Sequence, residues 1–314
     1  MPEIRPPDAR VDDPGLRHFT RDFAAMGTRF SVTCVGGDQS LLEAAEDFTH
    51  RLEAKWTRFD ESSELMCINN HPNEPVLVSP DTICLVREMV RGWKLTGHLF
   101  NPNVLAELLD LGFAASQVDA DRVTHWSQRV RSSKSMHDVR IDEAAGTVSV
   151  PRGVGLDAGG IGKGLAADML AQQVLAGGAL GVSVFASGEV RVAGTPPIGD
   201  QWRIGVEHPE EDDALIDTLE IVDGGVATSG TAGWVSHGGH HLVDPRTGRS
   251  ADTATIQATV VAGLCVDAEI IVKACMLLTP DGAVALAGRL GAEALVVDRD
   301  LVAHMTDGWE DLCS

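Results

Sequence analysis

The chain has 314 residues, 44% of them hydrophobic, a size and composition typical of a soluble globular protein with a substantial core. Its formal net charge of −21 disfavours nucleic acid and anionic membrane surfaces as main partners. No signal-peptide core precedes residue 21, no stretch is long enough to span a membrane, and the six cysteines form no C-x-x-C pair. We therefore expect a reduced, cytoplasmic protein without a zinc site or a disulfide framework.

The N-terminal part of the sequence predicts an arm followed by a strand and a helix. Residues 1–20 are polar and contain prolines, so we expect a poorly ordered arm there and one domain over residues 21–314. Alternating residue types predict a strand within residues 23–35. Apolar residues at helical spacing predict an amphipathic helix over residues 41–56.

In the middle of the chain the sequence predicts two helices and a strand, separated by a segment whose secondary structure it does not predict. Ser79 is placed to cap a second helix, which runs to about Leu95. Residues 114–140 are polar and carry no clear pattern. Residues 147–151 predict a strand that leads into a glycine-rich loop, and a helix over residues 162–175 follows that loop.

The second half consists mainly of short strands without the alternation of strands and helices that builds a parallel sheet. The predicted strands occupy residues 182–186, 190–193, 202–206, 215–222 and 257–262. Two helices near residues 268–278 and 282–290 precede a strand at residues 294–297. This order favours an α+β fold with mixed or antiparallel sheets over a doubly wound parallel sheet.

The glycine-rich loop, residues 155–168, reads G-L-D-A-G-G-I-G-K-G-L-A-A-D. Backbone N–H groups that are free at a helix start, next to the Lys163 ammonium, form an anion site. A Walker A loop would need Gly at Asp157 and Ser or Thr at Gly164, and the Rossmann G-x-G-x-x-G spacing is absent. The loop therefore indicates a less common kind of nucleotide site.

Four other segments share this richness in glycine and polar residues. They read A-M-G-T at residues 25–28, T-G-H-L-F-N-P at 96–102, T-S-G at 228–230 and H-H-L-V-D-P-R-T-G at 240–248. With the glycine loop, and in this order, they resemble the blocks A-M-G-T, G-x-F-D-P, D-x-G-G-x-x-K-G-x-x-x-D, T-S-G and H-x-x-D-P-x-T-G of the ApbE family of FAD:protein FMN transferases. The resemblance extends from about residue 23 to residue 297.

The resemblance implies a T-fold-like α+β unit of two lobes, with FAD in the groove between them. Met26 would lie against the flavin, and Phe59 would stack on it. Phe can serve where the family often has Tyr, because stacking needs only a ring face. Asp157 would contact FAD, and Lys163 would lie near its phosphates. The residues alone also allow a core aromatic at Phe59, a turn carboxylate at Asp157 and a solvated charge at Lys163. The other positions that the resemblance assigns to FAD binding are Phe100, Asn101, Thr228, Ser229 and Leu242.

The implied reaction is a phosphoryl transfer, in which a Ser or Thr hydroxyl of an acceptor flavoprotein attacks the FMN-side phosphorus of FAD and AMP leaves. His241 matches the family position proposed as the proton acceptor, and neutral imidazole suits that role. A purely structural histidine is the alternative. If this segment is a strand, the neighbouring His240 faces the opposite way.

The family usually binds a divalent cation through a glycine-loop carbonyl, here that of Gly160, and through the Asp and Thr of an A-D-x-x-x-T block. Residues 268–273 read A-E-I-I-V-K, so Glu269 replaces the Asp and Lys273 the Thr. Glu keeps an oxygen donor suited to Mg²⁺, whereas a charged Lys has no lone pair. Glu269 and Lys273 could instead form an ordinary i,i+4 ion pair, or the Lys273 ammonium could neutralise the diphosphate in place of the metal.

Two further departures are Asn101 in place of the family Asp, and A-S-G-E at residues 186–189 in place of the usual Gly-Gly-Asp turn.

The leading expectation remains a transferase that moves FMN from FAD to a Ser or Thr of a partner protein, with Mg²⁺ and a homodimer left open. The alternatives are a FAD diphosphatase that yields FMN and AMP, and a non-catalytic FAD-binding protein with a degenerate metal site.

Overall fold

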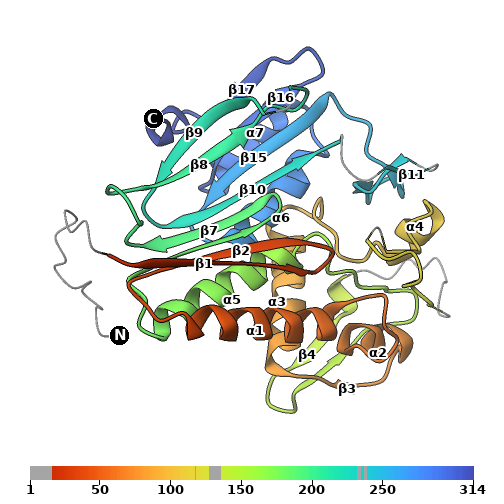
Figure 1. The fold of residues 1–314 in the computed structure, drawn as a ribbon. Helices are drawn as coiled ribbons and strands as arrows, with labels where there is room; N and C mark the ends of the chain where they lie inside the picture. The colour runs from red at the N-terminus through yellow and green to blue at the C-terminus, as the bar shows by residue number, and fades with distance from the viewer. Residues whose placement is uncertain (1–15, 117, 127–135, 212, 232–234, 237–238) are drawn as a thin grey trace.

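A computed structural model describes residues 16–116, 118–126, 136–211, 213–231, 235–236 and 239–314 (Figure 1). Its centre is an eight-stranded sheet in the order β1-β2-β6-β7-β10-β15-β16-β17, in which all neighbours are antiparallel. The strands are β1 (His18–Ala25), β2 (Thr28–Val35), β6 (Gly181–Ala186), β7 (Glu189–Gly194), β10 (Gly224–Gly230), β15 (Thr255–Ala262), β16 (Glu293–Asp298) and β17 (Ala303–Met305).

Four helices cover one face of this sheet. They are α1 (Ser40–Trp56), α5 (Gly162–Ala176), α6 (Cys265–Cys275) and α7 (Pro280–Arg289), and α1 lies beside α5 (Figure 1). Val182 and Val184 of β6 share a core cluster with Leu170 of α5, and Val260 of β15 shares another with Ile271 of α6. Burial of these branched side chains against the helices is the main force that holds the layers together.

The other face of the sheet is covered by a hairpin of β8 (Trp202–Glu207) and β9 (Leu215–Ile221). Trp202, Leu219 and Val226 share a core cluster there with the fully buried Trp309. The indole Nε1 of Trp309 donates a hydrogen bond of 3.0 Å to Asp217 Oδ2. This polar partner lets the ring be buried without leaving its N–H unsatisfied.

A smaller region stands beside the large sheet. It contains α2 (Glu64–Asn70), α3 (Pro80–Leu95), α4 (Leu105–Asp110), η1 (Met136–Asp138) and the sheet β3-β5-β4, formed by β3 (Val76–Leu77), β5 (Thr147–Ser149) and β4 (Arg140–Asp142). α3 crosses α6 at Gly92, where a Cβ would lie 2.8 Å from Ile270 Cδ1. Gly92 therefore permits the close approach that joins this region to the main helical layer.

The α+β class with antiparallel sheets is confirmed, as are the predicted helices over residues 41–56, from Ser79 to Leu95 and over residues 162–175. The predicted strand within residues 23–35 is instead two strands, because Met26 and Gly27 form a turn between β1 and β2. Strand β10 was not predicted. The division into two lobes stays a prediction.

The N-terminal boundary needs one correction. β1 begins at His18, inside the stretch expected as an arm, whereas residues 1–15 lie outside the described residues. The remaining short elements are β11 (Val235–Ser236), β12 (Gly239–His240), β13 (Val243–Asp244), β14 (Arg249–Ser250) and η2 (Glu310–Leu312). Among the described residues, no helix has the length and apolar character needed to cross a membrane.

Candidate functional site

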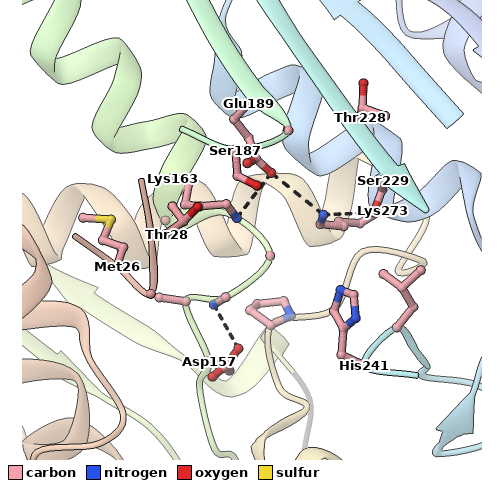
Figure 2. A pocket seen from close by; sticks show the side chains of 18 of the residues that line it. Met26, Thr28, Asp157, Lys163, Ser187, Glu189, Thr228, Ser229, His241 and Lys273 are labelled. Carbon is pink, nitrogen blue, oxygen red and sulfur yellow. Dashed lines mark hydrogen bonds and ion pairs between the residues drawn. The ribbon is translucent and has the colours of Figure 1, made fainter. Parts of the chain in front are cut away.

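A cavity of about 780 Å³ opens where β10, α5, α6 and the β1–β2 turn come together (Figure 2). Its volume falls in the range of ligand-binding pockets. The lining includes Met26, Phe59, Phe100, Asn101, Asp157, Gly160, Lys163, Thr228, Ser229, His241, Leu242 and Lys273. Of the residues predicted for the site, Glu269 alone is absent from this lining, because it is fully buried behind the wall.

The glycine loop is held in place from α2. The side-chain amide of Asn69 donates to Leu156 O at 2.9 Å and accepts from Leu156 N at 2.8 Å. At Gly155 a Cβ would lie 2.5 Å from the ring of Trp126, so only glycine fits beneath that ring. The loop is therefore fixed by contacts made before any ligand arrives.

Asp157 is anchored within the loop and also faces the cavity. Its Oδ2 accepts the N–H of Gly159 at 2.9 Å, and Arg58 Nε lies 3.3 Å from its Oδ1. The Arg58 guanidinium lies 4.4 Å from the ring centroid of Phe59, which is half-buried rather than a core aromatic. Burial lowers the pKa of Arg58, and Asp157 opposes that shift. Asp157 thus has the turn role considered from the sequence, beside a cationic neighbour that the sequence reasoning missed.

The A-M-G-T block is a hairpin turn that points at the cavity. Ala25 pairs with Thr28, so Met26 and Gly27 form a two-residue loop with φ values of 51° and 73°. Positive φ at both positions is the requirement of a type I′ turn, whose twist matches the flanking strands. This turn brings Met26 and Thr28 to the cavity wall (Figure 2).

Four charged side chains meet in the wall behind the glycine loop. Lys163 Nζ lies 3.2 Å from Glu269 Oε1 and 3.3 Å from Glu189 Oε1. Lys273 Nζ lies 4.0 Å from Glu189 Oε1 and donates to Ser229 Oγ at 3.1 Å. Figure 2 shows Lys163, Glu189, Lys273 and Ser229 linked in succession. We call Lys163, Glu189, Glu269 and Lys273 the charge cluster.

Burial and pairing shift the pKa values within the charge cluster. Burial raises the pKa of Glu189 to about 7, although Lys163 lowers it. Burial also lowers the pKa of Lys273. Burial alone would lower the pKa of Lys163 as well, but Glu189 and Glu269 outweigh it and raise that pKa above its usual value. Lys163 is therefore a firmly held cation.

The α5–α6 crossing places Glu269 in this cluster. Gly164 N donates to Glu269 Oε2 at 2.7 Å, and a Cβ on Gly164 would lie 2.7 Å from Cys265 O. The Asp168 carboxylate accepts the N–H groups of Cys265 at 3.0 Å and Val266 at 2.8 Å, at the start of α6. Asp168 is accordingly a structural helix cap, and burial raises its pKa to about 6.

His241 lies between β12 and the β13–β14 hairpin. Asp244 fixes this hairpin through a salt bridge of 2.8 Å to Arg246 Nη2 and a backbone hydrogen bond of 2.8 Å from Gly248 N. His240 Nε2 lies 2.8 Å from Ala251 O, whereas His241 lines the large cavity. The two neighbouring imidazoles are thus in different surroundings, and His241 is the one at the site.

A sequence model of the ApbE family matches residues 26–296. The chain belongs to the ApbE family.

Two relatives and two solved structures illustrate the similarity. A FAD:protein FMN transferase of Vibrio cholerae is 24% identical over 302 residues, covering 92% of this chain and 88% of the relative. One of Treponema pallidum is 27% identical over 333 residues, covering 94% and 89%. The ApbE protein of Thermotoga maritima superposes with a TM-score of 0.82 at 27% identity, covering 94% of this chain and 99% of the other. The flavin transferase ApbE of Vibrio cholerae has the same fold, with a TM-score of 0.79 at 21% identity and coverage of 95% and 99%.

The side chains at the ApbE metal position do not fit a divalent cation. Both oxygens of Glu269 are engaged, one by Lys163 and one by Gly164 N–H. Lys273 brings an ammonium group, and its Cγ lies 3.8 Å from where a Gly160 Cβ would be. No cluster of three or more His, Cys, Asp or Glu side chains suited to a metal occurs in the described parts of the chain. The i,i+4 ion pair between Glu269 and Lys273 that the sequence allowed does not occur among the described residues. Glu269 pairs instead with Lys163 of α5.

Glu189 and Arg58 were not predicted as site residues. Glu189 lies in the A-S-G-E segment at residues 186–189, so the departure from the Gly-Gly-Asp turn was the available signal. Arg58 directly precedes Phe59, but its contact with Asp157 joins segments that are far apart in sequence. Only the fold reveals that contact.

Proposed function

We propose that this protein transfers FMN from FAD to a Ser or Thr hydroxyl of a partner protein and releases AMP. Two curated relatives that match most of the chain carry the name FAD:protein FMN transferase. The observation that carries the proposal is the convergence of the glycine loop, two lysines and His241 on one cavity. A phosphoryl transfer needs positioning, charge neutralisation and a proton acceptor, and these groups supply all three.

We assign the flavin to the part of the cavity beside Met26 and Phe59. The Phe59 ring is half-buried and offers a stacking surface, and the positive φ at Met26 holds its side chain at the turn. Asp157, Phe100, Asn101 and Leu242 would complete the FAD contacts. FAD is the substrate in this scheme, so it turns over rather than remaining bound.

The reaction breaks one bond and forms one bond. The acceptor hydroxyl oxygen attacks the phosphorus on the FMN side of FAD, the bond from that phosphorus to the bridging oxygen breaks, and AMP leaves with the bridging oxygen. FMN is then joined to the acceptor through a phosphoester. His241 takes the proton of the hydroxyl, and Lys163 and Lys273 offset charge on the phosphate oxygens. No step requires a metal ion.

The partner in this scheme is a flavoprotein with an exposed Ser or Thr. Thr228, His241 and Leu242 line the cavity, and we assign the approach of the acceptor segment to this side, next to the proposed proton acceptor. A cytoplasmic location stays a prediction from the sequence, whereas a homodimer and bound Mg²⁺ stay possibilities that the sequence left open. Bound Mg²⁺ is the less favoured of the two, given the charge cluster.

Covalent flavin transfer is the direct test. The purified protein is incubated with FAD and flavoproteins from the same cell, with Mg²⁺ or with EDTA, and separated on a denaturing gel. Fluorescent protein bands, an FMN adduct on Ser or Thr by mass spectrometry and AMP in equal amount are the expected result. FMN and AMP without labelled protein would identify a FAD diphosphatase. Intact FAD after long incubation would identify a binding protein.

A further inference from the structure

Lys273 is a largely but not fully buried cation at the ligand cavity. It lies in the last turn of α6, and its side chain is only 16% exposed. Its stem lies beside Gly160, and its ammonium bonds to Ser229 at the end of β10. The stem and the ammonium are thus placed by the glycine loop and by the T-S-G block, two separate walls of the same cavity. An ammonium in this position is costly to bury unless a negative group compensates it.

Of the two lysines in the charge cluster, Lys273 has the greater donor capacity left for a ligand. Lys163 lies between the carboxylates of Glu189 and Glu269, and both pairs are close. Lys273 has one hydrogen bond, to Ser229, and one longer contact, 4.0 Å, to Glu189 among the described residues. An ammonium group has three donors, so Lys273 keeps donor capacity toward the cavity.

We propose that the Lys273 ammonium binds the diphosphate of FAD directly and makes FAD binding independent of a divalent cation. This inference rests on the proposed use of FAD by this protein. The ammonium is a compact point charge, suited to phosphate oxygens, and it is held by the protein rather than recruited from solution. The chain thus carries one of its own counter-charges for the diphosphate.

The competing possibility is a cation bound at Glu189. Its Oε2 is buried and has no hydrogen-bond partner among the described residues, so it could in principle face a metal ion. However, Lys163 Nζ and Lys273 Nζ lie 3.3 and 4.0 Å from the other oxygen of the same carboxylate. Their positive charges oppose a divalent cation there, because like charges at such distances repel strongly in a partly buried site.

Ligand affinity measured without turnover tests the proposal. FAD and riboflavin are titrated into the full-length protein, with fluorescence or calorimetry as the readout, in EDTA and in millimolar Mg²⁺. For the wild type we expect the FAD affinity to agree within about twofold in the two buffers. In Lys273→Met we expect FAD affinity to fall roughly 10- to 100-fold, the size of one charge-assisted hydrogen bond. Riboflavin lacks the phosphates, so its affinity should be unchanged.

Two further variants make the result interpretable. Lys94→Met removes a lysine from the exposed end of α3 and should leave FAD affinity as in the wild type. Lys273→Thr replaces the ammonium by a hydroxyl group, so its FAD affinity should fall as in Lys273→Met both in EDTA and in Mg²⁺, because Lys163 and Gly164 N–H still engage Glu269. Circular dichroism melting curves establish that each variant is folded.

Several outcomes would overturn the proposal. Wild-type FAD binding that disappears in EDTA would place a metal at the site. An unchanged FAD affinity in Lys273→Met, or an equal loss of riboflavin affinity, would show that Lys273 does not act on the diphosphate. These results leave FAD binding itself intact, whereas a wild type that binds FAD in neither buffer would refute the proposed function as well.

Discussion

In the proposed reaction, single side chains of the cavity, which come from different segments of the chain, divide the tasks of a phosphoryl transfer. Lys163 and Lys273 come from α5 and α6, whereas His241 comes from the link between β12 and β13. Lys163 is held by two carboxylates, so its position is set before a ligand binds. Positioned charge of this kind acts without reorganisation during the reaction.

Replacement of His241 by alanine tests the proton acceptor. We expect the transfer rate to fall about 10²- to 10⁴-fold, the usual contribution of a general base, while FAD affinity changes little. A single-turnover assay of covalent flavin on the acceptor measures the rate. His71→Ala removes an exposed histidine from the end of α2 and should keep full activity. A His241→Ala enzyme with the wild-type rate would exclude this residue as the base.

The Asp168 carboxylate provides a test of stability against pH. Burial raises its pKa from 3.8 to about 6 in the folded protein. The folded state therefore binds the proton more tightly, so this group contributes stability below pH 3.8 that is lost as the pH rises through about 6. Between pH 4 and 7 the loss amounts to about 2 kcal/mol of unfolding free energy.

Urea unfolding of Asp168→Asn at several pH values measures that contribution. The variant should be less stable overall, because the amide cannot replace both hydrogen bonds to the start of α6 or the ion pair with Arg191. Its unfolding free energy should nevertheless fall less than that of the wild type between pH 4 and 7. Asp307→Asn, at an exposed position, should keep the wild-type pH slope. Parallel curves for Asp168→Asn and the wild type would contradict the expectation.

At the scale of secondary-structure elements, the site depends on how closely α5 and α6 pack. A Cβ at Gly164 would lie 2.7 Å from Cys265 O and 2.9 Å from Glu269 Oε2. The backbone of α6 has no free space to move into, since its Ile270 already contacts α3 at Gly92. The second glycine of the G-K-G sequence is therefore required by packing rather than by a phosphate.

Gly164→Ala should separate the two helices. We expect a loss of about 1–3 kcal/mol in unfolding free energy, the usual cost of an overpacked site, and weaker FAD binding because Glu269 and Lys273 move with α6. Gly263→Ala is the matched control, since nothing lies within 4 Å of its Cβ position and stability should stay nearly unchanged. Thermal unfolding and FAD titration measure both effects. If Gly164→Ala were as stable as the wild type, α5 and α6 would have room for an extra methyl group at Gly164, and the packing argument would be wrong.

The sequence predicted most elements, but it missed those that depend on contacts distant along the chain. Strand β10 was missed because its G-G-V-A-T-S-G sequence is rich in glycine and has only two β-branched residues, Val226 and Thr228, while β7 and β15 pair with it on both sides. Met26 was expected to lie within one strand, because a methionine at positive φ is rare without a turn that demands it.

Prediction of the site residues was limited in the same way, by contacts between segments that are distant along the chain. The ordered blocks located part of the cavity lining, because each block is local in sequence, whereas other lining residues such as Arg122, Glu189 and Gln257 lie outside every block. The partners of Glu269 could not be predicted in this way, since Lys163 lies on α5 and the helical period favoured a pair with Lys273 on α6. Which charges pair across a helix crossing is decided by packing, and packing is not encoded at any fixed sequence spacing.

At the scale of the whole molecule, a chain of net charge −21 has a cavity whose lining includes the cations Arg58, Lys163 and Lys273 together with the carboxylates of Asp157 and Glu189. FAD carries a negatively charged diphosphate, so the distant field of the protein repels it while the lysines and Arg58 attract it at short range. Salt screens the distant field over about 10 Å at 0.1 M, and it screens buried groups much less. Added salt should therefore weaken the repulsion more than the attraction.

Stopped-flow binding at rising ionic strength tests this balance. Between about 10 and 200 mM salt we expect the association rate constant of FAD to rise by roughly two- to fivefold, because electrostatic forces act mainly on association. Riboflavin is uncharged, so its association rate should stay constant and serves as the control for general salt effects. A rate constant for FAD that falls with salt would mean that the cations at the cavity, rather than the acidic surface, govern its approach.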